Sequence, residues 1–191
     1  MGTFNRMYVN GEWIGAAGGA EFEVRDPATG QVVGSVPDGG AAETQMALDA
    51  AAAAFPRWSA TPAKDRGVIL NRIGAGMESK RDDIARLIVQ ENGKPFEEAK
   101  KEVAFALGYY AWFAEESRRL GGQWVPSPMP GKRLWVFHQP VAPVAATTSW
   151  NFPSTMVTRK IAPALAAGCP VVLKPASATP LTALAAPVDR A

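Results

Sequence analysis

The sequence predicts an α/β fold, and three observations support that class. Hydrophobic residues make up 47% and charged residues 20% of the 191 residues, which is typical of a globular protein with a buried core. Helical periodicity dominates residues 41–120. Towards the C-terminal end, two short apolar runs flank a further helical segment, the pattern of a β-α-β unit. Helices beside parallel strands define the α/β class.

Residues 1–120 are predicted to form hairpins followed by helices. Between residues 7 and 36, short alternating runs are separated by turn-forming pairs such as Asn10-Gly11, which favour β-hairpins. The pattern then becomes helical as far as residue 120, with room for three or four helices. The expected breaks are Pro56, Pro62 and Gly93-Lys94-Pro95.

Residues 121–140 are predicted to leave this compact unit. The stretch 121–131 holds three prolines and three glycines, which disfavour a helix and most central strands. We therefore expect a linker or crossing loop there. Residues 134–137 are apolar and predict a strand.

Residues 141–191 are predicted to form the β-α-β unit. The run 141–148 is almost entirely apolar, so we expect a strand buried on both faces. A helix over 153–167 and a second strand over 170–174 follow, with a further helix beginning near residue 179. Because such crossovers are right-handed, the two strands should be parallel and end at one edge of the sheet.

That edge is the expected ligand site, because loops and free helix N–H groups meet there in open α/β sheets. Asn151 follows the first strand and Lys174 ends the second. A neutral amide can donate to an oxyanion, and an ammonium can hold phosphate or ribose oxygens. The spacing leaves a second interpretation equally open, in which Asn151 caps the next helix and Lys174 is a solvated strand end.

The sequence lacks the residues and motifs of several other kinds of site. It contains neither a Walker loop nor the glycine fingerprint of standard dinucleotide sites. Cys169 precedes the strand that ends in Lys174, roughly 16 Å away at the opposite edge, and is expected to be a buried core residue. His138 is expected to be a surface strand residue. With one cysteine and one histidine, no usual zinc site can form, so no metal is expected.

The net charge and the lengths of the apolar segments limit which kinds of partner we expect. Twenty basic and eighteen acidic residues leave a net charge of +2, and no basic tract is dense enough for nucleic acid. The longest uncharged apolar stretch, residues 161–173, is too short to span a bilayer. No secretory signal is indicated. We therefore expect a cytoplasmic protein without nucleic-acid or membrane partners.

Several motifs together resemble the N-terminal part of NAD(P)-dependent aldehyde dehydrogenases, most closely those acting on succinate semialdehyde. The likeness extends from Tyr8 to Ala185. The motifs are Asn10-Gly11-Glu12-Trp13, Asp26-Pro27-Ala28-Thr29-Gly30, Glu91-Asn92-Gly93-Lys94-Pro95, Trp112-Phe113-Ala114-Glu115-Glu116, Trp150-Asn151-Phe152-Pro153, Thr158-Arg159-Lys160, Pro163-Ala164-Leu165-Ala166-Ala167-Gly168-Cys169 and Lys174-Pro175-Ala176-Ser177-Ala178-Thr179-Pro180.

The resemblance implies roles at the predicted edge. In that family a thiolate attacks the aldehyde and hydride passes to the nicotinamide; a glutamate-activated water then releases the acid. Asn151 would be the donor to the tetrahedral oxyanion. Lys174 would bind the adenosine ribose, and three neighbouring residues would line the cofactor cleft. Those three are Thr148, Ser149 and Trp150.

Four further positions carry implications from the resemblance. Arg159 matches a position that faces the distal carboxylate of succinate semialdehyde; the less favoured alternative is a surface arginine on a helix beside Lys160. Lys160 would have an electrostatic or structural part near the site. Ser177 stands where many NAD-preferring relatives carry Glu, so NADP should be tolerated or preferred over NAD. Ser149 replaces the proline usual before Trp-Asn, which leaves a backbone N–H and a looser turn.

The family's nucleophilic cysteine and general-base glutamate come from later sequence, so we expect a truncated cofactor-binding domain that is inactive alone. The likeness fades after Ala185, and Pro187 is expected to break a helix that the family continues. The resemblance assigns residues 121–140 to the start of an oligomerisation β arm. The resemblance implies that full-length relatives are homo-oligomers. Because the remaining strands of the arm are missing here, we do not expect this chain to form the same oligomer. The alternative is a non-catalytic fragment with weak nucleotide binding or self-association.

Overall fold

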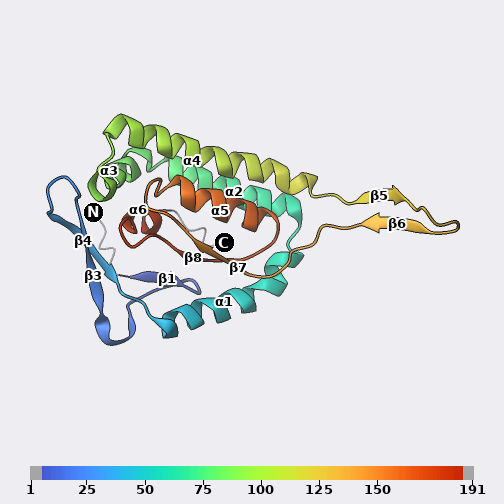
Figure 1. The fold of residues 1–191 in the computed structure, drawn as a ribbon, viewed down its shortest axis with the longest axis horizontal. Helices are drawn as coiled ribbons and strands as arrows, with labels where there is room; N and C mark the ends of the chain where they lie inside the picture. The colour runs from blue at the N-terminus through green and yellow to red at the C-terminus, as the bar shows by residue number, and fades with distance from the viewer. Residues whose placement is uncertain (1–5, 187–191) are drawn as a thin grey trace.

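The computed structural model describes residues 6–186, so the expected helix breaker Pro187 lies outside the described residues. Along the chain, four strands are followed by four helices, then by a projecting hairpin, and last by a β-α-β unit with a short helix (Figure 1). The helices are α1 (Ala41–Ala60), α2 (Ala63–Glu78), α3 (Arg81–Asn92), α4 (Phe96–Glu116), α5 (Thr155–Ala166) and α6 (Leu181–Leu184), with short 3-10 turns η1 (Ala17–Gly19) and η2 (Ser117–Arg119). The strands are β1 (Met7–Val9), β2 (Glu12–Ile14), β3 (Glu21–Arg25), β4 (Val32–Pro37), β5 (Gln123–Pro126), β6 (Arg133–Val136), β7 (Val144–Thr147) and β8 (Val171–Lys174).

The N-terminal strands form the two hairpins that the sequence predicts. β1 pairs with β2 and β3 with β4, both antiparallel. Asn10 and Gly11 have φ values of 51° and 84°, as a tight two-residue hairpin turn requires. Val24 and Val36 are buried against Leu87 of α3 and Leu181 of α6. The second hairpin is thereby fixed to the helical body.

Four helices occupy residues 41–116, in agreement with the helical pattern, but the predicted break at Pro56 is wrong. α1 continues through Pro56 to Ala60. The proline removes the hydrogen bond to the carbonyl of Ala52, and Ala52 is exposed, so solvent can hydrate that carbonyl. The other expected breaks, Pro62 and the segment 93–95, do separate helices.

α4 is the centre of the main core, because it packs against α2, α3 and α5. Its Val103 and Ala106 are completely buried beside Leu70 of α2 and Ile88 of α3. Burying a side chain the size of valine, leucine or isoleucine contributes roughly 1.5–3 kcal/mol. This helical layer supports the segments that reach the sheet edge described below.

β7 and β8 are parallel and joined by α5, which confirms the predicted β-α-β unit. Figure 1 shows the two strands between α5 and α1, and both helices contact β8. The expectation that the first strand is buried on both faces is wrong. Ala146 is buried, whereas Ala145 and Thr147 are exposed, since α5 packs on β7 while α1 packs on β8 and this sheet has only two strands among the described residues.

β5 and β6 form an antiparallel hairpin that projects from the body (Figure 1). Residues 123–126 were expected to be part of a linker, and their pairing as a strand corrects that expectation. A two-stranded ribbon leaves one edge of each strand unpaired, where Pro126 at the end of β5 is tolerated. Trp124 and Trp135 face each other in register, and each is 62% exposed.

Among the described residues, no helix is both long and apolar enough to cross a bilayer.

Candidate functional site

The candidate site lies at the edge where β7 and β8 end. Thr147 is the register partner of Lys174, and the backbone N–H of Thr148 donates to the Lys174 carbonyl at 3.3 Å. The chain therefore leaves both strands from adjacent positions. The segment that carries Asn151 and the segment that begins at Lys174 share one edge, as the crossover argument predicts.

Asn151 does not cap α5, so that interpretation of the residue is wrong. The first N–H groups of the helix, on Ser154 and Thr155, donate instead to Glu102 Oε1 at 2.9 and 3.2 Å. The exposed Asn151 side chain accepts a hydrogen bond from Ser149 Oγ on its Oδ1 at 2.8 Å. This bond orients the amide and leaves its Nδ2 donors without a partner among residues 6–186.

The carbonyl groups next to this amide are tied to other parts of the fold. The Trp150 carbonyl accepts from Asn92 Nδ2 at 3.0 Å and from Thr179 Oγ1 at 3.4 Å. The Asn151 carbonyl accepts from Lys94 Nζ at 3.2 Å. Sequence reasoning did not find these anchors, although Asn92 and Lys94 belong to a motif that carried the family resemblance.

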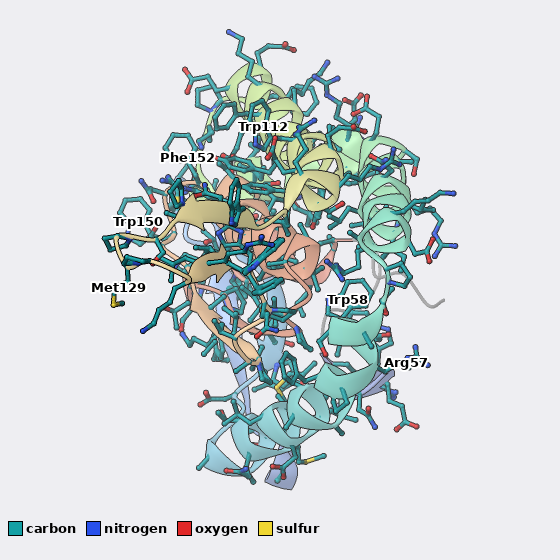
Figure 2. All side chains as sticks on the ribbon, turned by 90° about the vertical axis from the view of Figure 1, so that its right-hand side faces the viewer. Arg57, Trp58, Trp112, Met129, Trp150 and Phe152 are labelled. Carbon is teal, nitrogen blue, oxygen red and sulfur yellow. The ribbon has the colours of Figure 1, made fainter. Side chains whose placement is uncertain are left out.

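Lys174 and Ser177 lie together at the second strand's end. Lys174 Nζ donates to Ser177 Oγ at 3.1 Å, and both side chains are exposed. An ammonium beside a hydroxyl group presents donors suited to hydroxyl and phosphate oxygens. Thr148 is half-buried and Trp150 is 60% exposed. Figure 2 shows Trp150 and Phe152 on the same side of the view as Trp112 of α4.

The two basic residues on α5 differ in their surroundings. Lys160 Nζ donates to the Thr147 carbonyl at 2.5 Å, which holds the end of β7. Arg159 is exposed, and within the described part of the chain nothing pairs with its guanidinium. The structure thus leaves Arg159 accessible without bringing it into contact with Asn151 or Lys174.

The N-termini of α5 and α6 do not offer the free N–H groups that the sequence argument expected at this edge. Glu102 occupies that of α5, and Glu91 accepts from Leu181 and Thr182 of α6 at 2.7 and 2.9 Å. Burial raises the pKa of the Glu91 carboxyl to about 7, against the lowering effect of these hydrogen bonds. Any anion at the edge must therefore bind through side chains or other backbone groups.

The remaining candidates play no part at this edge. Cys169 is buried at 3% exposure before the start of β8, as predicted. His138 is exposed and its Nδ1 lies 2.5 Å from the Gly121 carbonyl; it follows β6 rather than lying within a strand. No group of three His, Cys, Asp or Glu side chains in the described ranges could hold a metal ion.

Residues 13–187 match the Aldehyde dehydrogenase family. A glutarate-semialdehyde dehydrogenase of Pseudomonas putida is 52% identical over 180 residues, which cover 94% of this chain and 38% of the relative. A succinate-semialdehyde dehydrogenase of Escherichia coli, named for NADP+, is 50% identical over 177 residues, covering 93% and 37%. The crystal structure of an NADP-dependent enzyme of E. coli matches with a TM-score of 0.91 and 48% identity, covering 95% and 38%.

The chain thus spans 33–38% of the length of the curated relatives it matches.

Proposed function

Because this chain belongs to the aldehyde dehydrogenase family, we propose that it is the cofactor-side part of an enzyme that oxidises a semialdehyde acid to the dicarboxylic acid. The family and its relatives are NAD(P)-dependent. Succinate semialdehyde is the first substrate to test, with glutarate semialdehyde as its one-carbon-longer competitor, since relatives of about equal identity carry these two names.

The observation that carries the proposal is the orientation of Asn151 at the edge it shares with Lys174. Ser149 donates to Oδ1 of the amide at 2.8 Å, so the Nδ2 donors remain available to a ligand at the edge. When a thiolate adds to an aldehyde carbonyl, the oxygen gains negative charge that these donors stabilise. A preorganised donor of this kind contributes about 2.7–4 kcal/mol to transition-state stabilisation.

Lys174 and Ser177 fit a nicotinamide dinucleotide through their chemistry, because ammonium and hydroxyl groups can donate to ribose and 2′-phosphate oxygens. The bound cofactor would accept the hydride of the aldehyde. Thr148, Ser149 and Trp150 line the same edge, where an exposed indole offers an apolar surface. Position 177 carries a serine and not the glutamate of many NAD-preferring relatives, which favours NADP+ over NAD+.

Arg159 would hold the distal carboxylate of the substrate, since a guanidinium can engage both carboxylate oxygens. The only cysteine of this chain is buried away from the edge. We therefore assign the nucleophilic thiolate and the general base to the part of the relatives' length that this chain does not cover. By itself the chain should form no NADPH from any aldehyde.

The direct test is Asn151→Ala in a full-length protein that contains this segment. We expect kcat with succinate semialdehyde to fall about 10²- to 10³-fold, while NADP+ affinity, measured by fluorescence titration, stays unchanged. Asn71→Ala, at an exposed asparagine on α2, is the control. A variant of Asn151 with unaltered kcat would contradict the assignment.

A second function has support from one observation, the exposed apolar hairpin β5–β6. A chain without aldehyde oxidation could still associate through this surface. Assaying a full-length protein that contains this segment for NADPH formation from succinate semialdehyde separates the two functions, and light scattering of the 191-residue chain measures its association.

A further inference from the structure

A buried ion pair lies beneath the loop formed by residues 149–155, here called the Asn151 loop. Lys94 follows α3, and its ammonium pairs with Glu102 of α4. The two side chains are only 12% and 1% exposed. They are the most buried of the ion pairs in the described part of the chain, and nothing in the activity proposed above uses them.

The pair contacts the Asn151 loop at four positions. Lys94 Nζ donates to the Asn151 carbonyl at 3.2 Å and lies 4.0 Å from the centroid of the Phe152 ring. Glu102 Oε1 accepts from the backbone N–H groups of Ser154 and Thr155 at 2.9 and 3.2 Å. Lys94 thus binds the loop at Asn151 and Phe152, and Glu102 binds it where it joins α5.

A buried ion pair is weak support for stability alone, because desolvation offsets much of the attraction and an apolar pair often does as well. Charged groups do fix position, since each must keep its partners or remain unsatisfied. The hydrogen bonds that the two side chains donate or accept outside the pair all involve this loop, and Glu102 also repels the nearby Glu91 carboxylate. The arrangement therefore suits orientation of that loop better than general stabilisation.

We propose that Lys94 and Glu102 are positioning residues that fix the Asn151 loop, so that the Asn151 amide is preorganised for the oxyanion. Lys94 fixes the backbone carbonyl of Asn151, while Ser149 fixes its side chain. The catalytic consequence rests on the proposed function of Asn151; the structural consequence does not.

The first test uses the 191-residue chain and NMR of its backbone amides. Lys94→Met should increase the mobility of Asn151 and Phe152, because it removes the ammonium that contacts them, while Ser154 and Thr155 keep Glu102 as their acceptor. Lys100→Met is the matched control, because Lys100 also lies over a phenylalanine ring, that of Phe96 at 5.5 Å, and beside Asp82 at 3.9 Å. That lysine has no contact with the loop.

Lys94→Met leaves a buried carboxylate unpaired and could prevent folding. The double variant Lys94→Met/Glu102→Gln removes both charges and leaves an amide oxygen to accept from Ser154 and Thr155. We expect this variant to fold while Asn151 and Phe152 become more mobile. If the loop is as ordered in the double variant as in the Lys100→Met control, the proposal is wrong.

The second test measures kinetics of the double variant in a full-length protein that contains this segment. A positioning role predicts a kcat at least about tenfold lower with an unchanged Kd for NADP+. Unchanged kcat alongside a mobile loop would overturn the catalytic role of the pair. If the unaltered protein oxidises no aldehyde, the proposed function fails, whereas the NMR result still decides whether the pair orders the loop.

Discussion

At the residue scale, single hydrogen bonds decide which groups are available at the sheet edge. The hydroxyl of Ser149 donates to Asn151 Oδ1, a bond that the proline usual in the family could not make. A serine in place of the proline therefore restrains the Asn151 side-chain amide through this hydrogen bond. The absence of the proline ring also leaves the backbone at position 149 freer. The Lys174–Ser177 contact similarly fixes the ammonium beside a neutral group.

Ser177→Glu should reverse the cofactor preference of a full-length protein that contains this segment. A carboxylate at this position would pair with Lys174 and repel a 2′-phosphate, while it could accept from a 2′-hydroxyl group. We expect kcat/KM for NADP+ to fall at least about tenfold, with kcat/KM for NAD+ maintained or increased. Ser79→Glu, at an exposed serine after α2, is the control. Equal effects on both cofactors would argue against contact between Ser177 and the ribose.

At the element scale, carboxylates from the helical layer hold the start of α5 and of α6. Glu91 of α3 is 3% exposed and accepts two N–H groups from α6. These contacts join residues 90 and more positions apart in sequence. The helices that follow β7 and β8 are thereby fixed to α3 and α4.

The raised pKa of Glu91 predicts a specific pH dependence of stability. Its carboxyl has a pKa of about 7 in the fold, against 4.5 for an ordinary Glu, so the folded chain binds more protons between these values. The free energy of unfolding should therefore fall as pH rises through this range, by on the order of 3 kcal/mol from this group.

Urea unfolding at pH 5 and pH 8 measures the effect. Glu91→Gln should remove this decrease, although its amide loses one of the two acceptors and lowers stability at both pH values. Glu98→Gln, at an exposed position of α4, should retain the decrease. The same pH dependence in both variants would show that Glu91 titrates normally.

The elements that local sequence could predict are those governed by local chemistry. Asn10-Gly11 specified its turn, and the apolar runs around α5 specified the parallel pair β7–β8. The continuation of α1 through Pro56 depended on whether the Ala52 carbonyl meets solvent, which local pattern does not reveal. Pairing of β5 with β6 likewise required a partner strand across a glycine- and proline-rich turn.

At the predicted site, too, features set by local sequence could be predicted and those set by distant residues could not. Crossover handedness brought Asn151 and Lys174 to one edge, because both follow strands of a single unit. Glu91, Lys94 and Glu102 escaped prediction, because they reach the edge from two helices and the loop between them, more than 50 residues earlier. In the sequence, Glu91 and Glu102 look like ordinary helix-surface charges, and Lys94 looks like part of a helix break.

At the scale of the whole molecule, the hairpin β5–β6 exposes apolar surface away from the helical core. Trp124, Trp135 and Phe137 are 62%, 62% and 72% exposed, and a two-stranded ribbon also presents unpaired edges. We propose this hairpin as the start of an oligomerisation arm. In the isolated chain, the same surface should cause association that depends on concentration.

Trp135→Lys should reduce that association by placing a charge on the hairpin. Light scattering over a range of concentrations should give a lower average mass than for the unaltered chain. Trp112→Lys is the matched control, since Trp112 is 63% exposed but lies on α4. An equal reduction by both variants would indicate nonspecific association through any exposed tryptophan.

The most direct measurement is a crystal structure of a full-length protein containing this segment with NADP+ bound. The account predicts Lys174 Nζ and Ser177 Oγ within hydrogen-bond distance of the adenosine ribose or its 2′-phosphate, with Asn151 Nδ2 facing the nicotinamide end of the same cleft. A cofactor bound elsewhere, or an Asn151 amide turned away from it, would contradict the account.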